Sequence, residues 1–311
     1  MKLLLLSALS FFFIATSTLA ITRFGFIAPK KEIPKTKVSQ KDENMILPPI
    51  PVLVNKSSFP ELSASASLVV DLPSGVTLYE KNPDNALLPA STTKIVTALV
   101  SMDYYHPDEV LTAGNEVAID GQKMNLKLGE KITVRDLLYG LLVYSANDAA
   151  EVLAKNYPGG RASFVTSMNL KAKELYLENS SFYNPSGLDG VGHVTSARDL
   201  VRVSSVAMKN PTFREMVGTR QITVKSVDGK TSHRLFNINE LLGQVDGVLG
   251  VKTGWTENAQ ENLVTYVERE DKKIMIAILG SQDRFGETKQ LIDWIWESFE
   301  WKGLVTPLTA D

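Results

Sequence analysis

The pattern of apolar and polar positions divides the 311-residue chain into three parts. Residues 3–22 are mostly apolar and end in small residues, which is typical of an export segment. Residues 28–60 are rich in Pro, Lys and small polar residues, and such a stretch buries too little apolar surface to fold by itself. From Glu61 onward the apolar positions are spaced as in packed helices and strands. We therefore predict a signal peptide or membrane anchor at 1–22, a Pro/Lys-rich linker at 23–60 and one folded domain at 61–307.

The N-terminal segment is compatible with two fates. It could be cleaved near Ala20, or it could remain as an anchor, because about 20 apolar residues are enough to span a bilayer. The length slightly favours the anchor. Either fate places the folded domain outside the cytoplasm, secreted or attached to the membrane in the cell envelope.

Periodicity within the domain predicts strands at both ends and helices between them. Residues 67–72 and 76–79 flank the turn-forming sequence Pro73-Ser74-Gly75, which indicates a hairpin. The stretch 132–154 predicts two helices with a break at 144–147. Three β-rich segments, 248–255, 262–268 and 273–279, predict an antiparallel meander, and residues 287–301 predict a closing helix. This order predicts an α/β domain of the α+β type, with one sheet built from both ends of the domain and covered by helices.

Local signals define some of the helix starts and one packing face. Thr133 with Asp136, and Ser196 with Asp199, are spaced as in a capping box. The closing helix carries a stripe formed by Leu291, Trp294, Ile295 and Phe299. We expect this stripe to pack on the sheet and not to form a membrane belt.

Composition and charge exclude several function classes. The chain has no cysteine, which rules out disulfides, thiol nucleophiles and thiolate metal sites. Its three histidines, His106, His193 and His233, are too scattered for a zinc motif, so we expect no metal and no cofactor. A formal net charge of −2 without a dense basic block argues against nucleic acid as the main partner.

Ser91 and Lys94 form the first candidate for chemistry. A serine nucleophile needs a base, and residues at i and i+3 share one helix face, so the Lys94 amine can reach the Ser91 hydroxyl. Pro89 and the apolar run 95–100 place Ser91 at a helix start, where free backbone N–H groups can stabilise an oxyanion. An SxxK spacing alone is common, and the competing interpretation is a serine that caps an ordinary helix.

Two further triplets support this site. Ser145-Ala146-Asn147 lies at the break between the two middle helices, where side chains can project into a cleft. A second SxN, Ser167-Met168-Asn169, lies inside a helical pattern and is expected to be ordinary helix surface. Lys252-Thr253-Gly254 lies on a predicted strand and offers a cation, a hydroxyl and a close backbone approach to an anionic substrate end. A plain turn is its competing interpretation.

The ordered set SxxK, SxN and KTG is that of penicillin-binding proteins and class A β-lactamases. The fuller sequences PASTTKIVTALV, FYNPSGLDGVGHVTSARDL and GVKTGWT resemble the low-molecular-mass D-alanyl-D-alanine carboxypeptidases, over residues 65–301. This resemblance implies a β-lactamase/transpeptidase-like fold, in which a five-stranded antiparallel sheet is flanked by helices and lies beside a mostly helical subdomain. It also implies action on peptidoglycan stem peptides that end in D-Ala-D-Ala, with β-lactams as acylating inhibitors.

The resemblance implies a role for each matching position. Ser91 would attack the substrate carbonyl, neutral Lys94 would accept its proton and Ser145 would pass it to the leaving D-alanine. Asn147 would position the substrate amide and Lys94, and Trp255 would supply the second oxyanion N–H. Lys252 and Thr253 would hold the free carboxylate of the substrate. Arg284 occurs where the family has a carboxylate-binding arginine, and a solvated loop arginine is its competing interpretation. Physics adds the requirement that burial and a nearby cation, Lys252, lower the pKa of Lys94.

One departure and three alternatives remain. Ala259 is followed by Gln260, where the family usually has glycine, so we expect a differently shaped hairpin there. A DD-endopeptidase uses the same chemistry on cross-linked peptides. A β-lactamase is disfavoured because the chain contains no ExxxN loop, and a non-catalytic wall-binding or β-lactam-sensing module would not need Ser91, Lys94 and Ser145 together.

Overall fold

A five-stranded antiparallel sheet forms the centre of the domain in the computed structural model, which describes residues 48–55 and 58–303. Its strand order is β3-β2-β10-β9-β8. The strands are β2 (Ala66–Asp71), β3 (Thr77–Lys81), β8 (Val248–Thr256), β9 (Gln260–Arg269) and β10 (Lys272–Ser281). The predicted N-terminal hairpin and C-terminal meander are confirmed, and they join through the pairing of β2 with β10.

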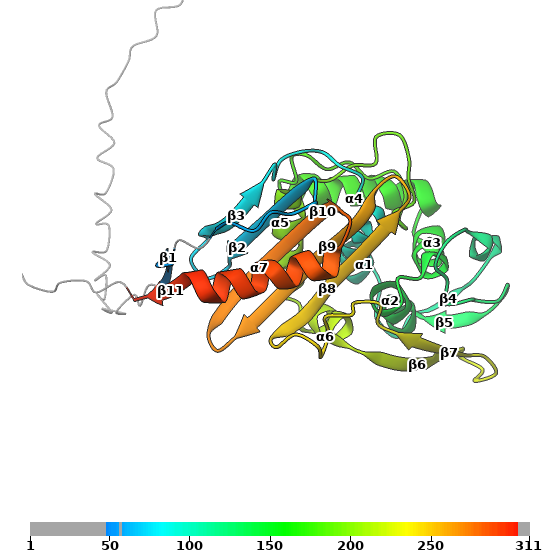
Figure 1. The fold of residues 1–311 in the computed structure, drawn as a ribbon. Helices are drawn as coiled ribbons and strands as arrows, with labels where there is room; N and C mark the ends of the chain where they lie inside the picture. Colours follow the sequence, from blue (N-terminus) through cyan, green and yellow to red (C-terminus); the bar gives the residue numbers. More distant parts are fainter. Residues whose placement is uncertain (1–47, 56–57, 304–311) are drawn as a thin grey trace, which may run out of the picture. The chain divides into compact units, whose positions relative to one another are not determined.

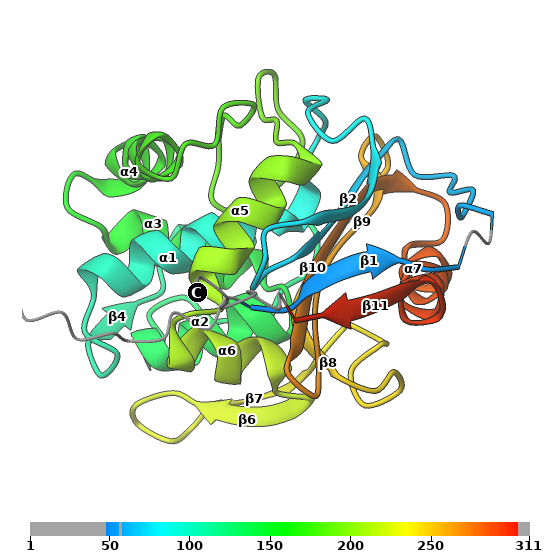
Figure 2. The same ribbon diagram turned by 90° about the vertical axis from the view of Figure 1, so that its left-hand side faces the viewer.

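Helices cover both faces of this sheet. Figure 1 shows α7 (Arg284–Ser298) on one face, and Figure 2 shows the remaining helices on the other. These are α1 (Lys94–Tyr104), α2 (Val134–Val143), α3 (Asn147–Asn156), α4 (Gly160–Glu174), α5 (Ala197–Ala207) and α6 (Pro211–Gly218). Two apolar clusters fill the two layers, one mainly between the sheet and the helical part and one beneath α7. The predicted α+β architecture is therefore confirmed.

Short elements complete the helical part of the domain. Two 3-10 turns, η1 (Ala90–Thr93) and η2 (Asn115–Ala118), flank α1 and its following loop. Two small two-stranded sheets lie at the end of the domain that is farthest from β3 (Figure 1). They pair β4 (Val110–Thr112) with β5 (Lys131–Thr133), and β6 (Gln221–Lys225) with β7 (Ser232–Phe236). Sequence periodicity did not predict these two sheets.

The local helix signals agree with the structure. The Thr133 side chain accepts a hydrogen bond from the Asp136 N–H at the start of α2, and Ser196 does the same for Asp199 at the start of α5. Leu291, Trp294 and Ile295 of the α7 stripe are buried against the sheet. The second SxN triplet lies within α4, as expected.

Two boundaries differ from the prediction. The closing helix ends at Ser298 and not at Trp301, because Phe299–Lys302 forms strand β11. This strand pairs antiparallel with β1 (Ile50–Leu53), which falls inside the predicted linker. A partner almost the whole domain away in sequence fixes both segments, so local patterns could not reveal the pairing. The predicted export segment and most of the linker lie outside the described residues.

The described part of the chain holds no helix that is long and apolar enough to cross a bilayer.

Candidate active site

Ser91 lies in the 3-10 turn η1, directly before α1. Its position at a helix start follows the prediction. The preceding residue, Ala90, has a φ of 47°, in the left-handed region that alanine rarely adopts. Such a conformation persists only where the surroundings hold it.

Close backbone packing supplies that support. A Cβ at Gly187 would lie 2.0 Å from the Ala90 carbonyl oxygen, and Gly187 itself has a φ of 89°. A Cβ at Gly254 would lie 3.0 Å from both the Ser91 nitrogen and the Pro89 oxygen. Two segments therefore press on the Ser91 turn, and each needs glycine to do so. The glycine of KTG thus has a role of steric origin.

Lys94 occupies the centre of the site and is fully buried. Its Nζ lies 2.7 Å from Oγ of Ser91 and 2.7 Å from Oδ1 of Asn147. It also donates to the backbone carbonyl of Ser186. The Asn147 amide is oriented by its Nδ2, which donates to the Asp120 carbonyl at 2.8 Å, so its Oδ1 must face Lys94 as an acceptor.

This arrangement fixes what the Lys94 amine can do. The Asn147 Oδ1 and the Ser186 carbonyl can only accept hydrogen bonds, so they take two of the amine hydrogens. A neutral amine has no third hydrogen, and its lone pair is then directed at the third neighbour, Ser91 Oγ. In that state the Ser91 hydroxyl donates to Lys94, which is the geometry of a general base and its nucleophile.

Burial lowers the pKa of Lys94 to about 7, whereas the carboxylates of Glu151 and Asp148 act in the opposite direction. We expected the charge of Lys252 to share in this effect, but the structure assigns the lowering to burial. A substantial neutral fraction is therefore present near pH 7 without help from a second cation.

Lys252 forms a second buried amine–serine pair. Its Nζ donates to Oγ of Ser145 at 2.8 Å and to the Thr253 carbonyl at 3.0 Å. Burial lowers the pKa of Lys252 well below its usual range, and the positive charges of Lys94 and Arg284 act in the same direction. Ser145 is 2% exposed and has a φ of 62°, so the break between α2 and α3 presents it in a strained backbone conformation. Within the described residues, Ser145 bonds to Lys252 and not to Lys94.

Two donors near Lys252 lack partners among the described residues. The Thr253 hydroxyl is buried and makes no hydrogen bond. Nη1 of Arg284 donates to the Gly254 carbonyl at 3.0 Å, but its Nε is buried without an acceptor. Buried donors are normally satisfied, so unpaired ones at a cavity wall indicate a place where a ligand supplies the acceptor.

These side chains line one cavity of about 730 Å³, which we call the catalytic cavity. Its wall includes the predicted Ser91, Ser145, Asn147, Thr253, Gly254, Trp255 and Arg284. Lys94 and Lys252 lie directly behind this wall through their bonds to Ser91 and Ser145. The structure thus brings together all nine predicted positions, although the Trp255 side chain is 60% exposed. No cluster of metal-binding side chains occurs in residues 48–55 and 58–303.

Several supporting residues were not assigned from the sequence. Ser186 and Asp120 act through their backbone carbonyls, which have no side-chain signature. Buried Asn262 donates to the carbonyls of Leu88 and Pro89 and so holds the chain before Ser91.

His193 accepts the Tyr183 N–H at Nδ1 and therefore donates from Nε2 to Thr93, next to Lys94. For Ser186, the available signal was the sequence NPSGLDG at 184–190, because its Asn and glycines indicate a tight turn.

Gln260 keeps the backbone that a glycine would favour. Its φ is 56°, and its side chain donates to the Glu257 carbonyl at 2.6 Å. The β8–β9 pairing runs without a break from Val251 to Thr256, which lies opposite Gln260. The left-handed conformation is adopted despite the side chain, and the expectation that the hairpin differs in shape from that of the family stays a prediction.

Comparison with known proteins places these features in a family. The sequence model of the D-alanyl-D-alanine carboxypeptidase family, peptidase S11, matches residues 53–283. The chain is 31% identical over 246 residues to the D-alanyl-D-alanine carboxypeptidase DacF of Bacillus subtilis, covering 76% of this chain and 63% of that protein. It is 34% identical over 242 residues to a D-alanyl-D-alanine endopeptidase of Pseudomonas aeruginosa, covering 76% and 78% of the two chains.

Solved structures agree with the sequence comparison. The Streptomyces K15 DD-transpeptidase superposes with a TM-score of 0.73 at 32% identity, covering 78% of this chain and all of that one. The chain spans less than two thirds of the length of the Bacillus protein. The family match covers well over half of the 311 residues. The chain therefore belongs to the D-alanyl-D-alanine carboxypeptidase family of serine peptidases.

Proposed function

We propose that the protein is a serine-type D-Ala-D-Ala carboxypeptidase that acts on peptidoglycan stem peptides and is acylated by penicillin. The observation that carries this proposal is the buried Lys94 amine, 2.7 Å from Ser91 Oγ and with a pKa of about 7. A base that is partly neutral at working pH, and in contact with one hydroxyl, is what acyl transfer to serine requires.

Acylation begins at Ser91. Its Oγ attacks the carbonyl carbon of the penultimate D-alanine while Lys94 takes the hydroxyl proton. The developing oxyanion is stabilised by the backbone N–H groups of Ser91 and Trp255. Support for this pairing comes from the tight packing of Gly254, the residue before Trp255, against the Ser91 nitrogen.

Ser145 delivers the proton to the leaving group. Because Lys252 donates into Ser145 Oγ, the hydroxyl hydrogen of Ser145 is free to point elsewhere. It can donate to the nitrogen of the departing D-alanine as the C–N bond breaks. Lys94 then passes the proton it took from Ser91 to Ser145, so Lys94 and Ser145 end the step as they began, and the net transfer is of the Ser91 hydroxyl proton to the departing amine.

The free carboxylate of the substrate is held by Lys252, Thr253 and Arg284. The unpaired Thr253 hydroxyl and the unpaired Arg284 Nε are the donors that such an anion would satisfy. Burial lowers the pKa of Lys252, and a bound carboxylate would shift that pKa back upward. Substrate binding and protonation of Lys252 are therefore coupled.

The second half-reaction is hydrolysis. Water attacks the Ser91 ester with Lys94 again as base, which frees the shortened peptide and regenerates the serine. Penicillin enters by the same attack, but its opened ring stays attached after the amide bond breaks. It therefore blocks the approach of water and leaves a stable acyl-enzyme.

Cellular placement follows from the substrate class. We propose that the domain at 61–307 acts outside the cytoplasm at the cell envelope, and that residues 1–22 export it or anchor it through the linker. The N-terminal segment supports this placement by its apolar sequence alone.

Intact-protein mass spectrometry after incubation with penicillin tests the proposed function. We expect one penicillin adduct on the wild type and none on Ser91→Ala. Ser167→Ala, in the unrelated SxN triplet of α4, is the matched control and should be acylated normally. Digestion of purified monomeric stem peptides should release D-alanine. A wild-type protein that forms no adduct and releases no D-alanine contradicts the proposal.

A further inference from the structure

Residues 120–130 connect η2 to β5 and bond directly to Asn147. The Asp120 carbonyl accepts a hydrogen bond from Nδ2 of Asn147 at 2.8 Å, and the Gln122 carbonyl accepts the Asn147 backbone N–H at 2.7 Å. A Cβ at Gly121 would lie 2.7 Å from Nδ2 of Asn147, so the approach is close. We call residues 120–130 the Asn147 strap. The position of the strap decides how the Asn147 amide is oriented.

Asp148 joins the strap to the start of α3. Its carboxylate is fully buried, and its Oδ1 accepts the N–H groups of Met124 and Ala149, each at 3.0 Å. Its Oδ2 accepts the Leu126 N–H at 3.0 Å. Two of these three donors belong to the strap. A buried carboxylate without an ion pair depends on such hydrogen bonds, so a neutral side chain at this position would release the strap from α3.

His233 of β7 holds the strap from the opposite side. Its Nδ1 donates to the Met124 carbonyl at 2.8 Å, and its Nε2 lies 2.6 Å from Oε1 of Glu130. Glu130 Oε2 accepts the Lys127 N–H at 2.9 Å, and both His233 and Glu130 are buried. Met124 is therefore held through its N–H by Asp148 and through its carbonyl by His233.

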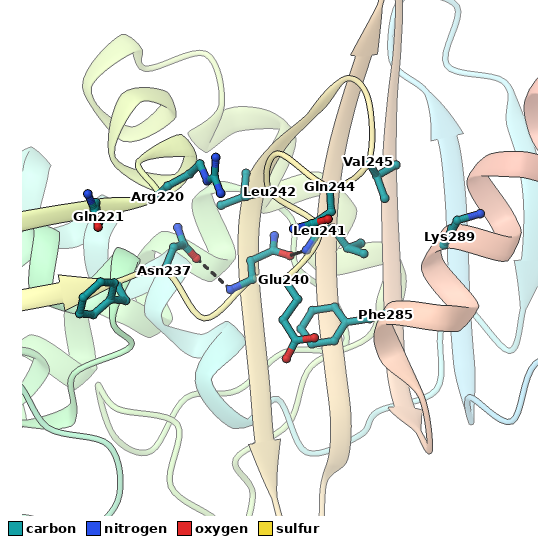
Figure 3. Close-up of a pocket in the computed structure, with 12 residues that line it drawn as sticks. Arg220, Gln221, Asn237, Glu240, Leu241, Leu242, Gln244, Val245, Phe285 and Lys289 are labelled. Atoms are coloured by element: carbon teal, nitrogen blue, oxygen red, sulfur yellow. Dashed lines mark hydrogen bonds between the residues drawn. The ribbon is translucent and has the colours of Figure 1, made fainter.

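The loop at 237–245, which follows β7, is also held by a side chain but has no connection to Asn147. Figure 3 shows Asn237, whose Oδ1 accepts the Asn239 N–H at 3.0 Å. This loop lines a cavity of about 1010 Å³ that shares no lining residue with the catalytic cavity. Within residues 48–55 and 58–303, no hydrogen bond joins the loop to Asn147 or Asp148. The strap, in contrast, bonds directly to the residue that orients the base.

Asp148 can act on Lys94 through position and through charge. The path through position runs along the strap to Asn147, whose Oδ1 lies 2.7 Å from Nζ of Lys94. Burial lowers the pKa of Lys94, and the negative charges of Glu151 and Asp148 oppose that shift. Glu151 has the charge effect alone, because its carboxylate is bound by Arg161 at 2.7 Å and not by the strap. The titratable groups that interact with Lys94 by charge are Glu151, Asp148, Lys252 and His193.

We propose that Asp148 is a positioning residue for the Ser91 reaction, which holds the strap so that Asn147 directs its Oδ1 at Lys94. This inference rests on the proposed Ser91 chemistry. Asp148 does not line the catalytic cavity, so its effect on position must pass through Asn147. Once the strap is released, the Asn147 amide can turn, and Lys94 loses an acceptor that fixes the direction of its lone pair.

Single-turnover acylation by saturating penicillin tests the inference when it is followed across neutral pH. Each variant then has a plateau rate and a midpoint pH. Asp148→Asn removes both position and charge, whereas Glu151→Gln removes charge alone. Asp199→Asn is the matched control, because Asp199 is also a buried carboxylate that accepts a backbone N–H, from Asn179 at 2.8 Å, but does not bond to the strap.

We expect Asp148→Asn to lower the plateau rate about tenfold and to move the midpoint to lower pH by about half a unit or more. Glu151→Gln should move the midpoint in the same direction and keep the plateau rate within about twofold of the wild type. Asp199→Asn should change neither. In an Asn147→Ala background, Asp148→Asn should cause no further loss of plateau rate, because effects that pass through one residue are not additive.

A wild-type plateau rate for Asp148→Asn, an equal loss for Glu151→Gln, or full additivity with Asn147→Ala would each overturn this inference alone. Circular dichroism verifies folding. If Asp148→Asn does not fold, His233→Gln replaces it, since it releases the strap from the opposite side. His233→Gln should also lower the plateau rate, and only where Asn147 is present; an unchanged plateau rate would overturn the inference. A wild type that forms no penicillin adduct would overturn the proposed function together with this inference.

Discussion

Nζ of Lys252 lies 2.8 Å from Oγ of Ser145, although 107 positions separate the two residues. It mirrors the contact between Lys94 and Ser91, so the site contains two buried amines and each faces its own serine. The two pairs divide the work that we propose. Lys94 and Ser91 carry out the nucleophilic attack. Ser145 protonates the leaving amine, and Lys252 binds the substrate carboxylate.

Lys94→Met tests the base directly. Methionine has a similar shape but no lone pair of comparable basicity, so Ser91 loses its proton acceptor. We expect acylation by penicillin to fall by about 10³-fold, within the range of general-base contributions. Stopped-flow acylation rates measure this, with circular dichroism to verify folding. Lys155→Met, at an exposed position of α3, should react normally. A Lys94→Met variant that retains the wild-type rate would remove Lys94 from the mechanism.

Thr253→Val separates binding from stability. The Thr253 hydroxyl has no partner among the described residues, so replacing it with a methyl group should leave the melting temperature unchanged or raise it. Because the hydroxyl would bond the substrate carboxylate, kcat/KM for a D-Ala-D-Ala peptide should fall about tenfold.

Thr256→Val, on the same strand, provides the contrast. The Thr256 hydroxyl donates to Asp189 at 2.8 Å and accepts the Ala259 N–H at 3.0 Å. This variant should lose stability. If Thr253→Val is the less stable of the two and keeps full activity, the hydroxyl has an internal role and not a substrate role.

Gln260→Gly should stabilise the protein. Gln260 holds a φ of 56°, and a left-handed conformation costs a non-glycine residue about 1–2 kcal/mol. The lost side-chain bond to Glu257 is exposed and offsets part of that gain, so we expect the free energy of unfolding to rise by about 0.5–1 kcal/mol. Denaturant titration measures the change. Gln260→Ala removes the bond and keeps the strain, so it should be no more stable than the wild type. Equal stabilities for the glycine and alanine variants would be inconsistent with backbone strain at this position.

His193 should make stability depend on pH. Burial lowers its pKa from 6.5 to about 4, with Asp189 opposing the shift and Lys94 adding to it. Between these values the unfolded chain binds a proton that the folded protein does not. The full stability is therefore present above pH 6.5 and is lost as the pH falls towards 4, by about 3 kcal/mol. His193→Gln should lose this share of the pH dependence. If the free energies of unfolding of the two proteins change with pH in the same way across this range, His193 does not cause the pH dependence.

Local sequence signals predicted those parts of the fold that local physics decides. The Thr133 cap, the hairpin of β2 with β3 and the contact between Ser91 and Lys94 each depend on residues a few positions apart. The β1–β11 pairing was missed because neither strand has a partner nearby in the sequence. The prediction that Lys252 and Ser145 belong to one site came from the family resemblance and not from a local sequence pattern.

Most of the site residues that were not predicted from the sequence act through their backbone groups. Ser186 and Asp120 contribute carbonyl groups that any residue possesses, and only the folded chain shows where they point. The predicted cause of the Lys94 pKa shift is confirmed for burial, whereas the expected contribution of the Lys252 charge is not among the causes. A sequence shows which charges exist but not how much water is excluded, and burial proved to be the larger effect.

The most direct test of the account is the pH dependence of Ser91 acylation by penicillin under single-turnover conditions. The protonated Lys94 amine cannot accept a proton, and its pKa in the folded protein is about 7. The acylation rate should therefore rise tenfold per pH unit below this value and level off above it. A rate that is flat across neutral pH, or that rises only near the pKa of an ordinary exposed lysine, would contradict the claim that neutral Lys94 is the base.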